Sequence, residues 1–87
     1  MYQVKFTLSA LDDLGRLSKP ISQRILNKIH WLAENLEALT PEPLTGPFEG
    51  VYKLRTGDYR VLYTFNKGEM SITVHFIRHR REVYKSR

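Results

Sequence analysis

The stretch VYKLRTGDYRVLYTFNKGEMSITVHFIR, residues 51–78, decides the fold because it holds three strand-like segments joined by very short connections. Residues 51–56 and 59–66 are rich in β-branched and aromatic side chains, and only Gly57 and Asp58 separate them. A three-residue Lys-Gly-Glu connection then leads into a third segment, residues 70–78. Connections this short join neighbouring antiparallel strands, so the sequence predicts an antiparallel meander.

The residues before the meander predict one strand and a pair of helices. Residues 2–8 alternate polar and apolar side chains, as a half-buried strand does. Ser9 is expected to cap a short helix that ends near Leu17, and Ser18 to cap a longer helix with Pro20 in its first turn. The longer helix carries an apolar stripe at three- and four-residue spacing: Ile21, Ile25, Ile29, Leu32 and Leu36.

These elements predict an α+β fold with the order β-α-α-β-β-β, in which a helical hairpin packs on one face of an antiparallel sheet. Pro and Gly punctuate residues 39–50, which are expected to form a surface connection. The 87 residues are expected to form a single domain, 1–87. The absence of cysteine excludes disulfides and thiolate metal sites. No leader-like segment or apolar run of about 20 residues is present, so the sequence indicates a cytoplasmic protein with no membrane partner.

Basic side chains are concentrated in the second half of the chain. Residues 51–87 carry nine Lys or Arg against three Asp or Glu, whereas residues 1–50 carry five against six. The formal net charge of +5 is therefore a property of the C-terminal half. Positive charge mixed with aromatic rings is typical of surfaces that bind a phosphate backbone and stack on bases. Composition alone supports a basic domain that binds nucleic acid, or simply a solvated charged face.

Strand alternation assigns the side chains of the meander to the two faces of the sheet. On the first strand of the meander, Lys53 and Arg55 point to the face opposite that of Tyr52 and Leu54. We therefore expect them on the face that the helices leave open. Strict alternation does not bring Arg78 to that face, and a β-bulge or the strand end must re-aim it. Four aromatic residues are expected to be core residues rather than stacking platforms: Tyr52, Tyr59, Tyr63 and Phe65.

No familiar catalytic constellation is present, such as a glycine-rich phosphate loop or an HExxH motif. The basic half has no paired carboxylates, which disfavours a nuclease that uses divalent metal ions. RNA, however, carries its own nucleophile, the 2′-hydroxyl group. A cationic site can orient that group, take its proton and stabilise the charge that develops on the phosphate. The cations that would form such a site are Lys53, Arg55, Arg60 and Arg78.

Three motifs carry a resemblance to a known family. LTG at residues 44–46 followed by GVYKLR at 50–55, GDYRVLY at 57–63 and RHRREVY at 78–84 together resemble the RelE/ParE toxin superfamily, on its RelE side. The resemblance implies a ribosome-dependent endoribonuclease that cuts mRNA in the ribosomal A site without cofactor or metal. It also implies a cognate antitoxin in a type II operon, with operator DNA contacted only through that antitoxin.

The resemblance also implies roles for individual residues. The positions that match the family's catalytic set are Lys53, Arg60, Arg78 and Tyr84. The positions that match substrate-binding residues are Arg55, His79, Arg80 and Arg81. Val51 stands where some members carry a second lysine, which shifts the proton-transfer role towards Lys53 or Tyr84 and keeps a catalytically weak RNA-binding module as an alternative. A second alternative is a ParE-like inhibitor of DNA gyrase that is not a nuclease.

Overall fold

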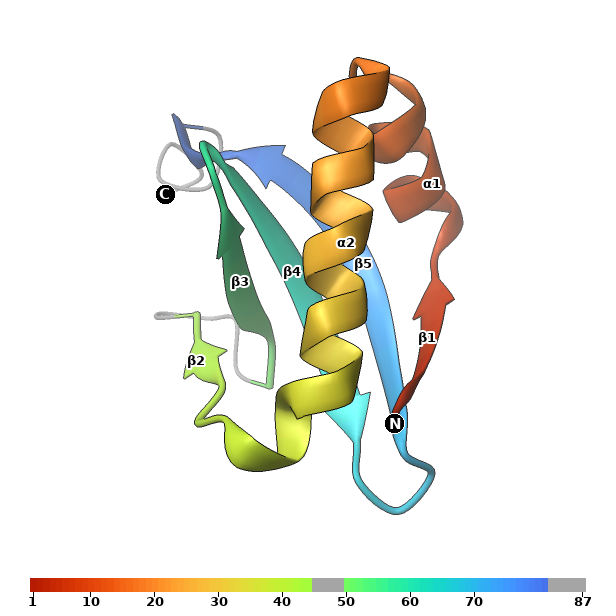
Figure 1. Ribbon diagram of the computed structural model, residues 1–87, viewed down its shortest axis with the longest axis vertical. Coiled ribbons are helices and arrows are strands. Elements are labelled where there is room, and N and C mark those ends of the chain that lie inside the picture. The colour runs from red at the N-terminus through yellow and green to blue at the C-terminus, as the bar shows by residue number, and fades with distance from the viewer. Residues whose placement is uncertain (45–49, 82–87) are drawn as a thin grey trace.

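Two helices lie against a five-stranded sheet in the computed structural model, which describes residues 1–44 and 50–81 (Figure 1). The helices are α1 (Leu8–Gly15) and α2 (Lys19–Asn35), and α2 continues into a 3-10 turn at Leu36–Ala38. The strands are β1 (Gln3–Phe6), β2 (Glu42–Pro43), β3 (Tyr52–Thr56), β4 (Tyr59–Asn66) and β5 (Ser71–His79). The predicted α+β architecture and its element order are therefore confirmed.

The strands lie in the order β1-β5-β4-β3-β2. β3, β4 and β5 pair antiparallel, which confirms the predicted meander. β1 pairs parallel with β5, so the sheet is mixed rather than entirely antiparallel. Short connections do not set the direction of β1, because both helices separate it from the meander. The short strand β2 adds an edge to β3 within the segment expected to be only a connection.

The start of α1 differs from the prediction. Thr7, not Ser9, is the N-cap, and its hydroxyl oxygen accepts a hydrogen bond from the backbone N–H of Ala10 at 3.1 Å. The helix begins this early because β1 ends at Phe6 and the chain turns at once. Ser18 is the N-cap of α2, as predicted, although its side chain makes no capping hydrogen bond.

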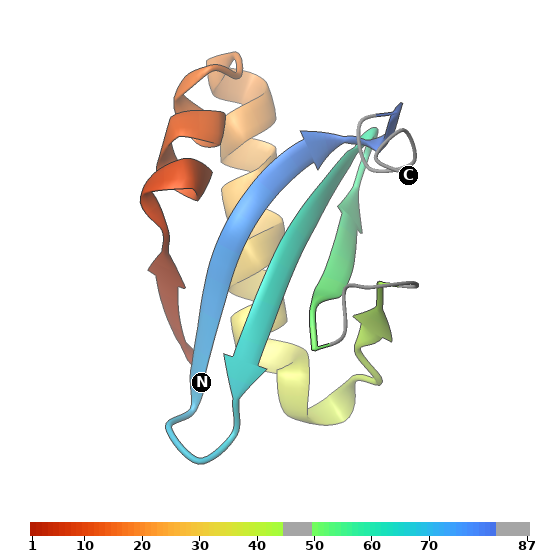
Figure 2. The same cartoon turned by 180° about the vertical axis from the view of Figure 1, so that it is seen from behind.

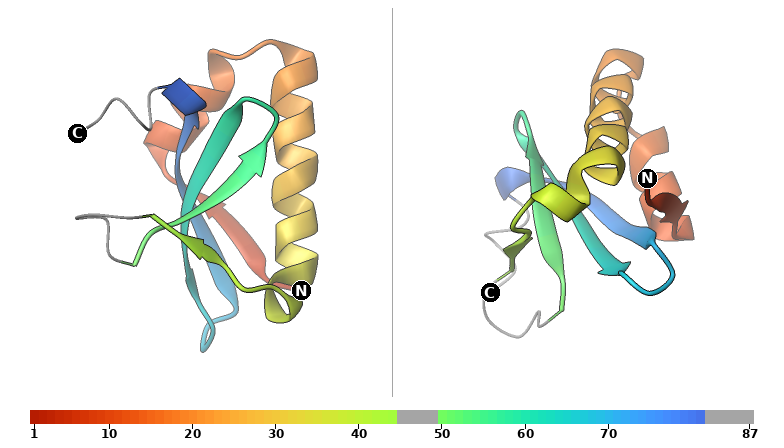
Figure 3. Two further views of the ribbon diagram at one scale, coloured as in Figure 1. Left: turned by 90° about the vertical axis from the view of Figure 1, so that its left-hand side faces the viewer. Right: turned by 60° about the horizontal axis from the view of Figure 1, so that its bottom comes forward.

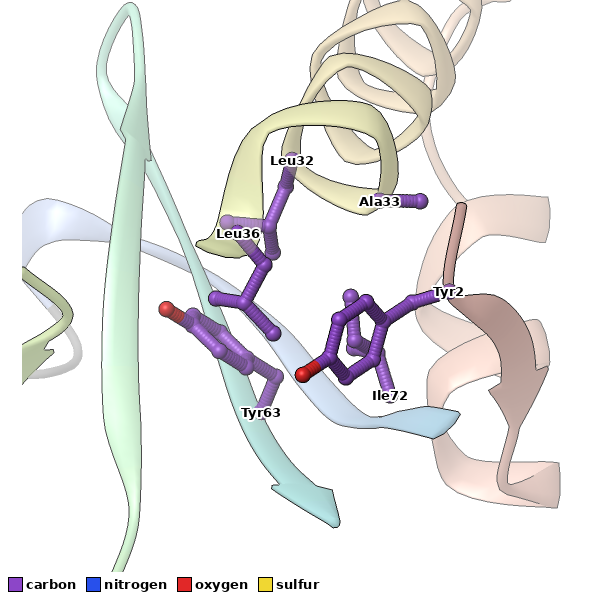
Figure 4. Close-up of a cluster of buried hydrophobic side chains, with 6 residues drawn as sticks. All are labelled: Tyr2, Leu32, Ala33, Leu36, Tyr63 and Ile72. Atoms are coloured by element: carbon purple, nitrogen blue, oxygen red, sulfur yellow. The ribbon is translucent and has the colours of Figure 1, made fainter. Parts of the chain in front are cut away.

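The apolar stripe of α2 packs into the core, as predicted. The core consists of two neighbouring clusters. One cluster lies under the C-terminal half of α2 (Figure 4) and contains Tyr2, Leu32, Ala33, Leu36, Tyr63 and Ile72. The other contains Ala10, Ile25, Ile29, Val61, Val74 and Ile77. Burial raises the pKa of Tyr63 to about 12, and the nearby Tyr52 adds to the shift, so this phenol stays neutral well beyond physiological pH. Tyr63 is therefore a core residue, as predicted.

The helices cover one face of the sheet and leave the other bare (Figure 2). Seen from below, the molecule shows α1 and α2 on the same side of the strands (Figure 3, right). We call the uncovered side the open face. Among the described residues, no helix combines the length and apolar character that crossing a bilayer requires.

A β-bulge between β4 and β5 changes which side chains reach the open face. Leu62 pairs with Phe76, whereas Tyr63 pairs with Val74, so one extra residue is inserted on β5. After this point Ile77 turns into the core, where it is 5% exposed, and its neighbours turn to the open face. Of the two devices expected to re-aim Arg78, a β-bulge and the strand end, the structure shows the bulge.

Candidate functional site

Three arginines stand in one row across the open face. Arg55 on β3 pairs with Arg60 on β4, and Arg60 pairs with Arg78 on β5. Directly opposed residues of neighbouring strands have Cβ atoms about 4.5–5.5 Å apart, and like charges at this spacing destabilise a sheet. A row of like charges is therefore stable only with anions nearby. Glu42 and Asp13 supply carboxylates to Arg55 and Arg78, and a polyanion bound to the open face would offset the remaining repulsion.

Arg60 lies at the centre of the row and is only 6% exposed. Its Nη1 donates to the carbonyl of Tyr59 at 3.1 Å and reaches the carbonyl of Gly57 at 3.5 Å. Its Nε is buried and has no hydrogen-bond partner among the described residues. Among residues 1–44 and 50–81, the structure shows no carboxylate within salt-bridge distance of this guanidinium. A buried charged group with one donor left without an acceptor is costly, and such groups gather at functional sites.

The two cations on β3 share one carboxylate. Glu42 on β2 pairs with Lys53 in the sheet, and its carboxylate lies 3.5 Å from Lys53 Nζ and 3.8 Å from Arg55 Nη2. The Lys53 side chain is 13% exposed, whereas that of Arg55 is 61% exposed. Sequence reasoning missed Glu42 because it precedes the basic half and belongs to a strand of two residues. The Glu-Pro pair at positions 42–43, set in a proline-rich connection, offered no periodic signal.

Arg78 ends the row and has two neighbours that the sequence did not predict. Its Nη1 donates to the carboxylate of Asp13 on α1. Its Cζ lies 4.7 Å from the centroid of the Phe76 ring, which is 39% exposed. Phe76 follows the bulge, adjoins the basic row and presents an exposed ring of the kind on which a base can stack. Without the bulge, strict alternation would place Phe76 on the same face as Ile72 and Val74, which are buried.

The remaining predicted residues lie apart from this row. His79 packs edge-to-face on Tyr59 at 5.4 Å, on the helix side of the sheet. Arg80 and Arg81 follow the end of β5 and are exposed, and the backbone N–H of Arg80 donates to the carbonyl of Asp58 at 2.7 Å. Tyr84 lies outside the described residues. The structure thus brings together Lys53 and three arginines of the predicted set.

An open cleft of about 350 Å³ adjoins the end of the row, between α1 and β5. Asp13, Arg78 and His79 are among its lining residues. Arg78 therefore stands at the boundary between this cleft and the open face. Within residues 1–44 and 50–81, no three His, Cys, Asp or Glu side chains are grouped closely enough to hold a metal ion.

Comparison with known proteins places these features in a family context. A sequence model of the family described as the ParE toxin of type II toxin–antitoxin systems (parDE) matches residues 4–84. Toxin RelE of Mycobacterium tuberculosis (strain ATCC 25618 / H37Rv) is 30% identical over 84 residues, which cover 97% of this chain and 87% of that protein.

Two solved structures have a similar fold. The chain in the toxin–antitoxin complex RelBE2 from M. tuberculosis superposes with a TM-score of 0.80 at 25% identity, covering 90% of this chain and 96% of that one. The isolated RelE toxin of E. coli superposes with a TM-score of 0.75 at 20% identity, covering 98% and 93%. At 20% identity the second similarity shows the fold alone.

Proposed function

This chain is a toxin of a type II toxin–antitoxin pair and belongs to the RelE/ParE superfamily, and from that premise we propose that it cleaves mRNA on the ribosome. The observation that carries the proposal is the buried guanidinium of Arg60 at the centre of a row of arginines, whose Nε has no hydrogen-bond partner in the described part of the chain. A phosphodiester that becomes more negative as it reacts is a fitting ligand for such a row, since arginine matches the geometry of phosphate oxygens.

The proposed reaction is attack by the 2′-oxygen on the adjacent phosphorus. A bond forms between the 2′-oxygen and phosphorus, the bond to the 5′-oxygen breaks, and the products are a 2′,3′-cyclic phosphate and a free 5′-hydroxyl. The 2′-hydroxyl loses its proton to a base, and the leaving 5′-oxygen gains one from an acid. Arg60 and Arg78 are proposed to stabilise the charge on the phosphorane.

Proton transfer is proposed to involve the Lys53–Glu42 pair. The ammonium group of Lys53 has no lone pair to accept a proton, whereas the carboxylate 3.5 Å away does. Glu42 is therefore a candidate base and Lys53 a candidate acid or charge-stabilising group. Tyr84 retains the role in proton transfer that the family resemblance implies. Single-turnover rates of Glu42→Gln and Lys53→Ala check this assignment, and wild-type rates for both variants would exclude it.

The competing proposal is a gyrase inhibitor, because the matching family model is described by ParE. The two proposals differ in what the purified toxin does to two defined systems. We expect it to cut a message that is bound to translating ribosomes and to leave gyrase-catalysed supercoiling unchanged, because the open face concentrates cations for phosphate chemistry. Inhibition of supercoiling with an intact message would reverse the assignment. A toxin that affects neither system would support the weak RNA-binding alternative.

The proposed partner is a cognate antitoxin, since the similar M. tuberculosis structure is itself a toxin–antitoxin complex. We expect an acidic or amphipathic antitoxin segment to cover the basic half of the toxin, including the chain from Arg80 onwards, in a tight 1:1 contact. Operator DNA would then be contacted only through the antitoxin. Amide exchange of the complex should show protection on β3 and at Arg80 and Arg81. An exchange pattern identical to that of the toxin alone would rule out this surface.

A further inference from the structure

The edge of β5 changes its partner along its length. β1 pairs with this edge only as far as Val74. Beyond Val74, two side chains bind the backbone of β5 where a neighbouring strand would otherwise pair. They are Thr7, the N-cap of α1, and Asp13 within α1. The hydroxyl of Thr7 donates to the carbonyl of His75 at 2.9 Å, and the carboxylate of Asp13 accepts from the backbone N–H of Ile77 at 2.8 Å. α1 thereby supports the end of β5 that carries the arginine.

The same oxygen of Asp13 has a second role. Its Oδ2 accepts from the Nη1 of Arg78 as well as from the backbone N–H of Ile77. The Asp13 side chain is 12% exposed and the Arg78 side chain 32% exposed. An ion pair this sheltered is screened less by salt than one on the surface. One carboxylate oxygen therefore holds both the backbone of β5 and the guanidinium at its end.

The remaining contacts restrict the guanidinium further. The Phe76 ring lies under its Cζ, with 4.7 Å to the ring centroid, and Nη1 is 3.4 Å from the carbonyl of Ile77. Among the described residues these hydrogen bonds use Nη1, which leaves the edge formed by Nε and Nη2 to face a phosphate. A guanidinium presents its donors in a fixed plane, and fixing one corner orients the others.

We infer that Asp13 is a positioning residue for Arg78, an inference that rests on the proposed RNA cleavage. Asp13 orients the guanidinium before substrate arrives, so less reorganisation is needed as charge develops on the phosphate. Its negative charge also weakens the attraction of Arg78 for a phosphate, so orientation of the guanidinium is the effect by which Asp13 speeds the chemical step.

The variant that tests this is Asp13→Asn. The amide oxygen can still accept from the backbone N–H of Ile77, while the ion pair with Arg78 is lost. We expect the single-turnover rate on ribosome-bound message to fall on the order of 10- to 100-fold, the scale of a misplaced catalytic group. Binding of a message with a 2′-deoxy nucleotide at the cut site should be unchanged or tighter. The matched control is Asp12→Asn, because Asp12 forms an exposed ion pair with Arg16 and should leave the rate unchanged.

A double-mutant cycle separates positioning from a general structural role. If Asp13 acts through Arg78, Asp13→Asn should slow the wild type but add nothing to Arg78→Ala. An equal slowing in both backgrounds would overturn the inference, and so would an Asp13→Asn toxin that cuts as fast as an active wild type. The Nε–H resonance of Arg78 gives a readout independent of cleavage. It should move towards that of a solvated arginine in Asp13→Asn, and an unmoved resonance would also overturn the inference. A wild-type toxin that cuts no message would overturn the proposed function itself, whatever the resonance does.

Discussion

Arg60→Ala and Arg78→Ala are each expected to slow single-turnover cleavage of ribosome-bound message on the order of 100-fold or more, by analogy with the loss of an oxyanion-stabilising donor. The two side chains occupy adjacent positions in one row of the sheet. Arg60 is buried and lacks an acidic partner among the described residues, whereas Asp13 holds Arg78. Both guanidinium groups would contact the same phosphate as negative charge develops on it.

The effect should be confined to the chemical step. Other Lys and Arg residues would still hold the toxin on the ribosome, so binding should change little. Arg24→Ala removes the same charge from an exposed position on α2, and Lys19→Ala removes a charge from the start of that helix. Both controls should cleave like the wild type. If the open face were only a solvated charged surface, the Arg60 and Arg78 variants would match the controls, and the catalytic assignment would fail.

A second large effect is expected from the ribosome itself. The basic row lies on the open face of a sheet, and the cleft beside it measures only about 350 Å³. We expect a shallow surface of this kind to bind a flexible RNA weakly and not to align the 2′-oxygen with the bond that breaks. The ribosome would supply that alignment, which is worth on the order of 100-fold or more. Cleavage rates of one message, bound to ribosomes and free in solution at matched toxin concentration, measure this directly. Equal rates would show that the toxin needs no ribosome.

The meander, the α2 stripe and the bulge could be predicted because each depends on residues close in sequence. Gly57 and Asp58 set the β3–β4 connection, and a period of two set which residues share a face. Strict alternation puts Arg78 and Lys53 on opposite faces, so they can share a face only if a bulge or the strand end re-aims Arg78. The bulge occurs opposite Leu62 and Tyr63. Local pattern was therefore enough to place Lys53 and Arg55 on the open face and to show that Arg78 needs a device to join them.

The acidic partners could not be predicted because they come from distant parts of the chain. Glu42 reaches Lys53 through a two-residue strand at the edge of the sheet. Asp13 reaches Arg78 because α1 continues along β5 after β1 ends, over a separation of 65 residues. The burial of Arg60 was equally hidden, since its position on the open face suggested exposure. Sequence patterns identified the charged side chains but not the ones that restrain them.

The central claim is that the open face promotes attack by the 2′-hydroxyl of RNA, and the ends of the cut message test it most directly. Wild-type toxin is incubated with message-bound ribosomes, and the termini at the cut are identified chemically. The account predicts a 2′,3′-cyclic phosphate, or the monophosphate formed by its opening, on one fragment and a 5′-hydroxyl on the other. A chelator that leaves the ribosomes intact should not change this result. A 3′-hydroxyl with a 5′-phosphate would show that water, not the 2′-oxygen, is the nucleophile, and would contradict the account.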